Sequence, residues 1–149
     1  MMWKTHLLFG FLIALILLPY INPENQILYV AIVLFGSLLT DIDHPDSKFG
    51  RKLKIIGMLF EHRGFFHSLF ALALFTVPFF LFNLDYIAIP LLIGYGSHIF
   101  IDSFSYQGIM FLHPLSRWKI KGFMKTGGFA EKILFFFLLI IFLWKLFTF

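Results

Sequence analysis

The residues that could carry chemistry are histidines and acidic side chains near the ends of apolar segments. Asp41 and Asp43 directly follow one apolar run. His67 lies at the start of another run, and His98 and Asp102 close a third. Ionisable groups at such places in a membrane chain are costly, and they are therefore candidates for function. Imidazole and carboxylate are ligands of divalent transition metals, so the pattern predicts a metal site that activates water for hydrolysis.

The spacing of these residues refines that prediction. His98 and Asp102 are four residues apart, so they share one face of a helix, as two ligands of one ion require. Asp41 and Asp43 are two apart and would point in nearly opposite directions on a continuous helix. Either the helix ends near Thr40, or one aspartate binds metal while the other orients a histidine. We expect at least one of the two to contact metal.

The predicted metal ligands are histidines and aspartates that come from four different segment ends. The set is His6, Asp41, Asp43, His67, His98 and Asp102. With no thiolate available, zinc is the expected ion, and manganese or iron(II) would also suit these donors. Six candidates exceed the three or four ligands of one catalytic zinc, which predicts two ions, or three.

Neighbouring polar residues are candidates for supporting roles. His62 and Glu61 are predicted to be catalytic, with His62 a proton donor or an orienting residue. The predicted substrate-binding residues are Arg63, Arg117 and His113, with the arginines as phosphate clamps or, equally, headgroup anchors. His44 and Ser68 are assigned no definite role, since a nucleophilic serine would also need an arranged base and an oxyanion hole.

Each feature also has a purely structural interpretation. A single histidine in a membrane chain is often an interhelical hydrogen-bond partner. The segment 41–45 could be a turn or a helix cap, and His98 with Asp102 could be a structural polar pair. The convergence of several segment ends at one membrane level favours a shared site over these separate explanations.

The composition fixes the class of protein that must position these groups. The chain has 149 residues, of which 60% are hydrophobic and 13% charged, and its mean hydropathy is +0.88. Soluble proteins are about 45–50% apolar and about 25% charged. The sequence therefore predicts an integral membrane protein, with residues 1–149 as a single domain. The absence of cysteine excludes disulfides and thiolate metal sites.

Five apolar runs predict an all-α, integral membrane helical bundle of about five spans. The runs cover residues 7–21, 27–40, 64–82, 86–101 and 133–149. Pro78 is a candidate kink, and Gly94 and Gly96 predict a close approach between helices. Residues 44–63 mix basic and apolar side chains, which predicts a short interfacial helix or, as an alternative, a solvated basic loop.

The distribution of charge predicts how the chain is oriented. Of the 12 Lys and Arg residues, all but Lys145 fall on the side that also holds the six histidines. The turns of the opposite side carry Glu24 and Asp85. The positive-inside rule then places the basic side in the cytoplasm, with the amino terminus inside and the carboxyl terminus outside the inner membrane. Membrane lipid is the expected partner, and no specific nucleic acid is expected.

An ordered set of short motifs also carries a family resemblance. The motifs occupy residues 39–47, 62–69, 94–98 with Asp102, and 108–118, with His6-Leu7-Leu8-Phe9 before them. In these residues the chain resembles the membrane-bound metal-dependent hydrolases first described as LexA-regulated inner-membrane proteins. That family looks distantly similar to zinc-dependent phospholipase C and single-strand nuclease enzymes, which are helical proteins with trinuclear zinc sites.

The resemblance implies a ligand set and an activity. His6, one of Asp41 and Asp43, His67, and His98 with Asp102 would be the metal ligands. The chain lacks several histidines of the soluble enzymes, so two ions are expected rather than three. The expected reaction is hydrolysis of a phosphoester, in a phospholipid or a related lipid-like substrate. The alternative is a non-enzymatic metal-binding, transport or scaffold protein, although a transporter would favour ionisable residues near the bilayer midplane.

Overall fold

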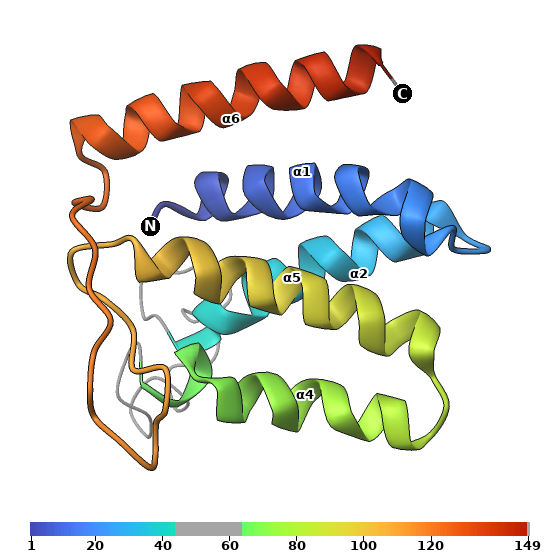
Figure 1. Cartoon of the computed structure of the whole chain (residues 1–149), viewed down its shortest axis with the longest axis horizontal. Coiled ribbons are helices and arrows are strands. Elements are labelled where there is room, and N and C mark those ends of the chain that lie inside the picture. The colour runs from blue at the N-terminus through green and yellow to red at the C-terminus, as the bar shows by residue number, and fades with distance from the viewer. Residues whose placement is uncertain (44–63, 149) are drawn as a thin grey trace.

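The computed structural model describes residues 1–43 and 64–148, which fold as helices joined by turns and one long loop (Figure 1). The described residues contain no β-strand, and two isolated bridges, Ser105–Met124 and Ile109–Ile120, lie in the loop before the last helix. The predicted all-α class is confirmed for this part of the chain. The predicted interfacial helix falls in 44–63, outside the described residues. The helices are α1 (Trp3–Ile21), α2 (Gln26–Leu39), η1 (Thr40–Asp43), η2 (Phe65–His67), α4 (Leu69–Leu81), α5 (Asp85–Ser103) and α6 (Phe129–Phe147).

Asparagines reverse the chain at the end of the bundle that lies far from the amino terminus. Asn22 ends α1 with a φ of 45°, in the left-handed region that asparagine tolerates better than most residues. Asn25 then caps α2, since its side chain accepts a hydrogen bond of 2.9 Å from the Leu28 N–H. Asn83, with a φ of 56°, follows α4 in the same way. These turns make α1 antiparallel to α2, and α4 antiparallel to α5 (Figure 1).

The closest helix packing is between α2 and α5, and small residues permit it. A Cβ added to Gly94 would collide with the backbone carbonyl of Val33, and one added to Gly36 would lie 2.9 Å from the Leu91 carbonyl oxygen. The prediction that Gly94 allows a close helix approach is therefore confirmed. The same prediction for Gly96 is wrong, because a Cβ there would meet nothing within 4 Å.

Three helix starts differ from the sequence prediction, and one of them is that of α6, which begins at Phe129, about one turn before the predicted residue 133. The third long helix, α4, begins at Leu69 and not near Gly64, because Ser68 has an extended backbone and caps the helix. The Ser68 Oγ accepts a hydrogen bond of 3.2 Å from the Ala71 N–H. His67 consequently lies in the short helix η2 that precedes the cap. Helix α1 begins at Trp3, one turn before the predicted start, so His6 is a helical residue.

The last helix lies on the outside of the bundle. In Figure 1, α6 runs beside α1, separated by α1 from the other helices. Leu138 of α6 belongs to a buried apolar cluster that also contains Met1, Leu12 and Ile101. The outer face of α6 exposes large apolar side chains, including Ile140, which is 66% exposed. Such a face suits contact with lipid.

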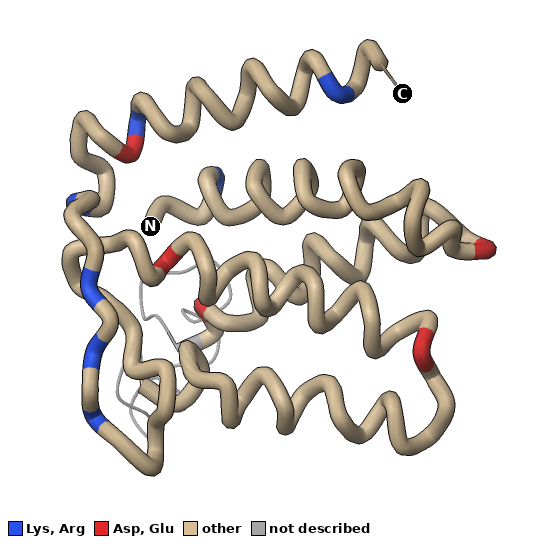
Figure 2. The backbone as a smooth tube through the Cα atoms, in the orientation of Figure 1, with Lys and Arg blue, Asp and Glu red and all other residues tan. Residues whose placement is uncertain are grey.

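Helix length and charge bear on the membrane prediction. By length and composition, one of the described helices, α1, qualifies to cross a bilayer, while α2 and α4 are apolar but shorter. Basic side chains gather at the end of the bundle where α1 and α6 begin, and the turns at the other end carry acidic residues (Figure 2). The structure therefore keeps the charge asymmetry on which the predicted orientation rests.

Candidate metal centre

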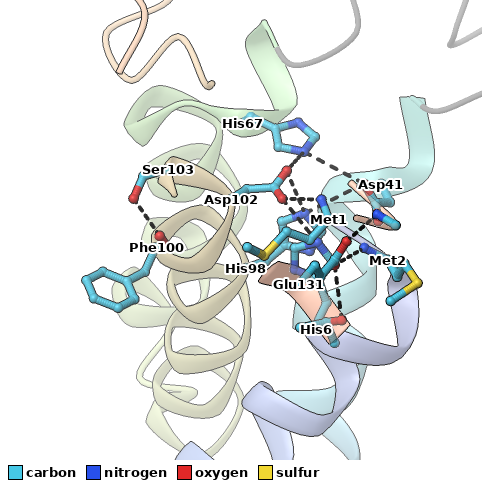
Figure 3. Close-up of polar contacts among 12 residues, drawn as sticks. Met1, Met2, His6, Asp41, His67, His98, Phe100, Asp102, Ser103 and Glu131 are labelled. Carbon is cyan, nitrogen blue, oxygen red and sulfur yellow. Dashed lines mark hydrogen bonds and ion pairs between the residues drawn. The ribbon is translucent and has the colours of Figure 1, made fainter. Parts of the chain in front are cut away.

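Five of the predicted ligands meet at the basic end of the bundle (Figure 3). They come from four different helices, because two of the five residues share α5. His6, His67, His98 and Asp102 are buried to 1% exposure or less, and Asp41 is partly buried. The residues are His6 on α1, Asp41 on η1, His67 on η2, and His98 with Asp102 on α5.

The predicted break of the second helix puts Asp41 in place. Helix α2 ends at Leu39, and the chain continues as the tighter turn η1. Asp41 Oδ1 then lies 3.7 Å from His67 Nε2 and 3.6 Å from His98 Nε2. Asp43 belongs to the same turn, but the position of its side chain is outside what the structure describes.

Asp102 faces the same two imidazoles with one of its oxygens. Its Oδ2 lies 3.5 Å from His67 Nε2 and 3.9 Å from His98 Nε2. Two ligand atoms on one tetrahedral zinc, each at about 2.0–2.1 Å, are about 3.3 Å apart. The observed separations exceed that value by a few tenths of an ångström. Asp41, His67 and His98 form one group whose ligand atoms lie within 4.8 Å of one another, and Asp102 Oδ2 faces both imidazoles, so these donors suit one ion.

The orientation of His98 is set by the backbone of α2. His98 Nδ1 lies 2.6 Å from the Ser37 carbonyl oxygen. Since a carbonyl only accepts, Nδ1 must carry the proton, and Nε2 presents a lone pair to the site. That Nε2 is buried and has no hydrogen-bond partner among the described residues. A buried acceptor left in this way fits a metal ligand whose other nitrogen is fixed by a backbone carbonyl.

His6 and His98 cannot both serve the same ion in this arrangement. Their rings are stacked, with centroids 3.7 Å apart and an interplanar angle of 5°. The lone pair of an imidazole nitrogen lies in the ring plane, and two parallel, separated planes share no point. By contrast, His67 and His98 are inclined at 69°, so their planes can meet at one ion. Although His6, His98 and Asp102 lie close enough to form a group, the stacking assigns the two imidazoles to different ions.

Asp102 is placed to join the two positions. Its Oδ1 lies 3.2 Å from His6 Nε2, whereas its Oδ2 faces His67 and His98. The amino nitrogen of Met1 also contacts Oδ1, at 2.5 Å. Two-metal sites hold their ions about 3.5–4 Å apart, which matches the spacing of the stacked rings. The donors would therefore suit two ions, with one oxygen of Asp102 available to each.

The electrostatics of the site favour a cation. Burial raises the pKa of the Asp41 carboxyl, but the neighbouring imidazoles, His98 foremost, outweigh burial and hold that pKa below its usual range. Asp41 is therefore ionised at neutral pH. A second carboxylate, Asp102, is buried beside it. Two carboxylates in a poorly solvated place are stabilised by a bound cation, because burying unpaired charge is costly.

Two residues outside the predicted set support the site. Glu131, on α6, is fully buried and accepts hydrogen bonds from the Met2 N–H at 2.6 Å and from the Thr5 hydroxyl at 3.1 Å. It thus fixes the first turn of α1, which carries His6. Tyr95 donates a hydrogen bond of 2.6 Å to the Phe66 carbonyl and so holds the turn that carries His67. Sequence reasoning missed Glu131, and the signal that could have found it is an acidic residue close to the start of an apolar run.

The remaining predicted residues lie apart from the ligand groups or outside the described chain. Ser68 is committed to capping α4, and its hydroxyl donates to the Phe65 carbonyl at 2.6 Å. His113 and Arg117 are in the loop between α5 and α6, and neither joins a ligand group formed by described residues. The structure does not describe His44, Glu61, His62 and Arg63.

Comparison with known proteins identifies an inner-membrane family. The family model described as YdjM inner membrane protein matches residues 1–148. Protein YvsG of Bacillus subtilis is 34% identical over 136 residues, covering 87% of this chain and 84% of the relative. The inner membrane protein YdjM of Escherichia coli is 33% identical over 133 residues, covering 79% of this chain and 67% of the relative. No solved structure matches the chain.

These matches confirm the inner-membrane part of the family resemblance. The name of the Escherichia coli relative states a location and no activity. The likeness to phospholipase C, and with it the hydrolase activity and the zinc, remain predictions.

Proposed function

The chain belongs to the YdjM family of inner membrane proteins, and from this premise we propose that it is a membrane-embedded, metal-dependent hydrolase. The proposed reaction is cleavage of a phosphoester, in a phospholipid or a related lipid-like substrate, at the cytoplasmic membrane surface. We further propose five membrane spans with the amino terminus inside, which is the orientation that the charge asymmetry supports.

One observation carries the proposal: two parallel imidazoles face the two oxygens of a single buried carboxylate. His6 Nε2 lies 3.2 Å from Asp102 Oδ1, and His98 Nε2 lies 3.9 Å from Oδ2, with the ring centroids 3.7 Å apart. A structural polar pair would need one histidine and one carboxylate. Two stacked histidines on one carboxylate, with two further donors beside them, suit a pair of ions.

The protein residues would divide the work of such a site. Bound divalent ions would supply an acidified water and charge stabilisation of the phosphoryl oxygens. Asp41, His67 and His98 would hold the first ion, and His6 would hold the second, with Asp102 shared between them. Burial of these donors limits access of bulk water, which strengthens the electrostatic interactions inside.

The second ion position would be the more open of the two. Among the described imidazoles and carboxylates, only His6 and Asp102 would reach it, beside the Met1 amino nitrogen that contacts Asp102 Oδ1, so positions would remain for Asp43, water or a substrate oxygen. Catalytic zinc sites keep such an open position, whereas structural sites are closed by four protein ligands. We propose that the substrate phosphate approaches there. His62 or Glu61 would supply the proton to the leaving group, and Arg63 or Arg117 would contact the phosphate.

A hydrolysis screen tests the proposal. The purified protein, reconstituted in lipid vesicles and supplied with Zn²⁺ or Mn²⁺, would be assayed against phospholipids and generic phosphodiesters. We expect activity that is lost on chelation and in Asp41→Asn, and kept in the matched variant Asp85→Asn at the opposite end of the bundle. Bound metal without activity on any substrate would favour a non-enzymatic metal-binding protein, and absence of bound metal would overturn the metal-dependent hydrolase and favour a scaffold.

A further inference from the structure

An apolar groove runs along the outside of the bundle between α1 and α5. Phe9, Ile13 and Leu17 line it on α1, and Leu92, Gly96 and Phe100 are among the residues that line it on α5. Its volume is about 330 Å³. Ligand pockets in proteins begin at about this size.

Gly96 keeps the groove open. A Cβ added to Gly96 would meet nothing within 4 Å. Gly94, two residues earlier, differs, because a Cβ there would collide with the backbone of α2. The close-packing explanation for a glycine therefore fails at position 96. Space at the missing side chain is consistent with an occupant that is not part of the described chain.

The dimensions of the groove select the kind of occupant. The lining from Phe9 to Leu17 extends about 12 Å along α1, at about 1.5 Å per residue. Even the whole atom-free space of this open groove, about 590 Å³, divided by that length gives a width of only about 8 Å. A helix with its side chains needs about 10–12 Å, so a partner helix does not fit. A single hydrocarbon chain, whose carbons pack about 3.5–4.0 Å from their neighbours, does.

The groove ends beside the metal centre. On α1, His6 lies one helical turn before Phe9, and on α5, Asp102 lies two residues after Phe100. Figure 3 places Phe100 on the same helix end as His98 and Asp102. The groove length also approaches the hydrocarbon depth of one leaflet, about 15 Å. A chain lying in the groove would bring its headgroup to the level of the ligands.

We propose that this groove binds one acyl chain of a membrane lipid and so positions that lipid's headgroup at the metal centre. The headgroup part rests on the proposed function, whereas binding of the acyl chain does not. The substrate class is thereby narrowed to lipids with at least one saturated or extended hydrocarbon chain. Water-soluble phosphodiesters would lack this contribution to binding.

Photo-labelling tests the groove directly. The protein in vesicles would be exposed to a phospholipid carrying a diazirine in one acyl chain, and labelled peptides would be identified by mass spectrometry. We expect the strongest labelling in the lining segments of α1 and α5. Gly96→Leu should reduce it about tenfold, the loss expected when about two methylenes can no longer be buried. The matched variant Ala31→Leu, in the apolar groove between α1 and α2, should leave it unchanged.

The outcomes separate the groove from the proposed hydrolase activity. Equal labelling of Gly96→Leu and the original protein, or labelling spread evenly over the exposed face of α6, would overturn the proposal that the groove binds an acyl chain. If Gly96→Leu does not fold, Ile13→Trp blocks the groove from α1 and serves in its place. If Gly96→Leu reduces the labelling but no phosphoester is hydrolysed, acyl-chain binding in the groove is supported and the proposed hydrolase activity is rejected. If both hold, Gly96→Leu should slow cleavage of long-chain lipids and spare a soluble phosphodiester.

Discussion

The replacement Asp102→Asn probes the assignment of the ligands to two ions. An asparagine keeps the size of the side chain and one acceptor oxygen but removes the charge and one of the two coordinating oxygens. Of the described donors, the second ion has only His6 and Asp102, whereas the first keeps Asp41, His67 and His98. The loss of metal affinity should therefore be larger for the second ion than for the first.

The expected loss of metal affinity follows from the number of donors that each ion would keep. Mutating groups that merely orient metal ligands costs about 10–100-fold in affinity. Removing one of two donors should cost the second ion at least about 100-fold, or about 2.7 kcal/mol. The stoichiometry of Asp102→Asn should therefore fall from two ions per chain to one, with the remaining ion bound more weakly because Asp102 Oδ2 also faces it.

The assay is elemental analysis of the purified protein after dialysis against a graded series of chelator concentrations. Asp85→Asn is the matched control, since it removes the same charge at the far end of the bundle. The division into two ions is refuted if Asp102→Asn retains two ions with the affinity of the unmodified protein.

Three further predictions follow from the packing and the charges. Gly94→Ala should destabilise the protein by about 1–3 kcal/mol through overpacking. Gly96→Ala should leave the stability unchanged or raise it by up to about 1 kcal/mol through helix propensity. Thermal unfolding in detergent compares the two variants, and equal effects would contradict the packing assigned to α2 and α5. Glu131→Gln should lower stability by about 1–3 kcal/mol, since one of its part-buried hydrogen bonds, from the Met2 N–H or the Gly127 N–H, loses its acceptor. It should also weaken binding of an ion at His6 while sparing the other, as a metal titration would detect. Metal affinity should fall as the pH is lowered, because the imidazoles must be unprotonated to bind metal. Asp41, whose pKa lies below its usual range, stays ionised at neutral pH and does not cause this loss. A calorimetric titration at several pH values that gave constant affinity would exclude imidazole ligands.

The meeting of the candidate ligands was accessible to sequence reasoning because it depends on chain topology. Antiparallel helices return segment ends to the same level, so His6, Asp41, His67 and the pair on α5 had to lie near one another. The two-residue spacing of Asp41 and Asp43 also predicted that the second helix ends near Thr40, as it does.

Other features depend on side-chain packing that no spacing reveals. The stacking of His6 on His98, which divides the donors between two ions, is set by ring rotation about χ angles and by the Ser37 carbonyl. The role of Glu131 depends on partners more than 120 residues away in the chain. Gly94 and Gly96 are two residues apart and have opposite surroundings because only one faces α2.

The most direct test of the two-ion centre is X-ray absorption spectroscopy of the zinc-loaded protein in lipid vesicles. We expect a first shell of nitrogen and oxygen at about 2.0–2.1 Å and a metal–metal vector at about 3.5–4 Å, the spacing of the stacked rings. The vector should disappear in Asp102→Asn. A nitrogen and oxygen shell with no metal–metal vector in the unmodified protein would contradict the two-ion centre.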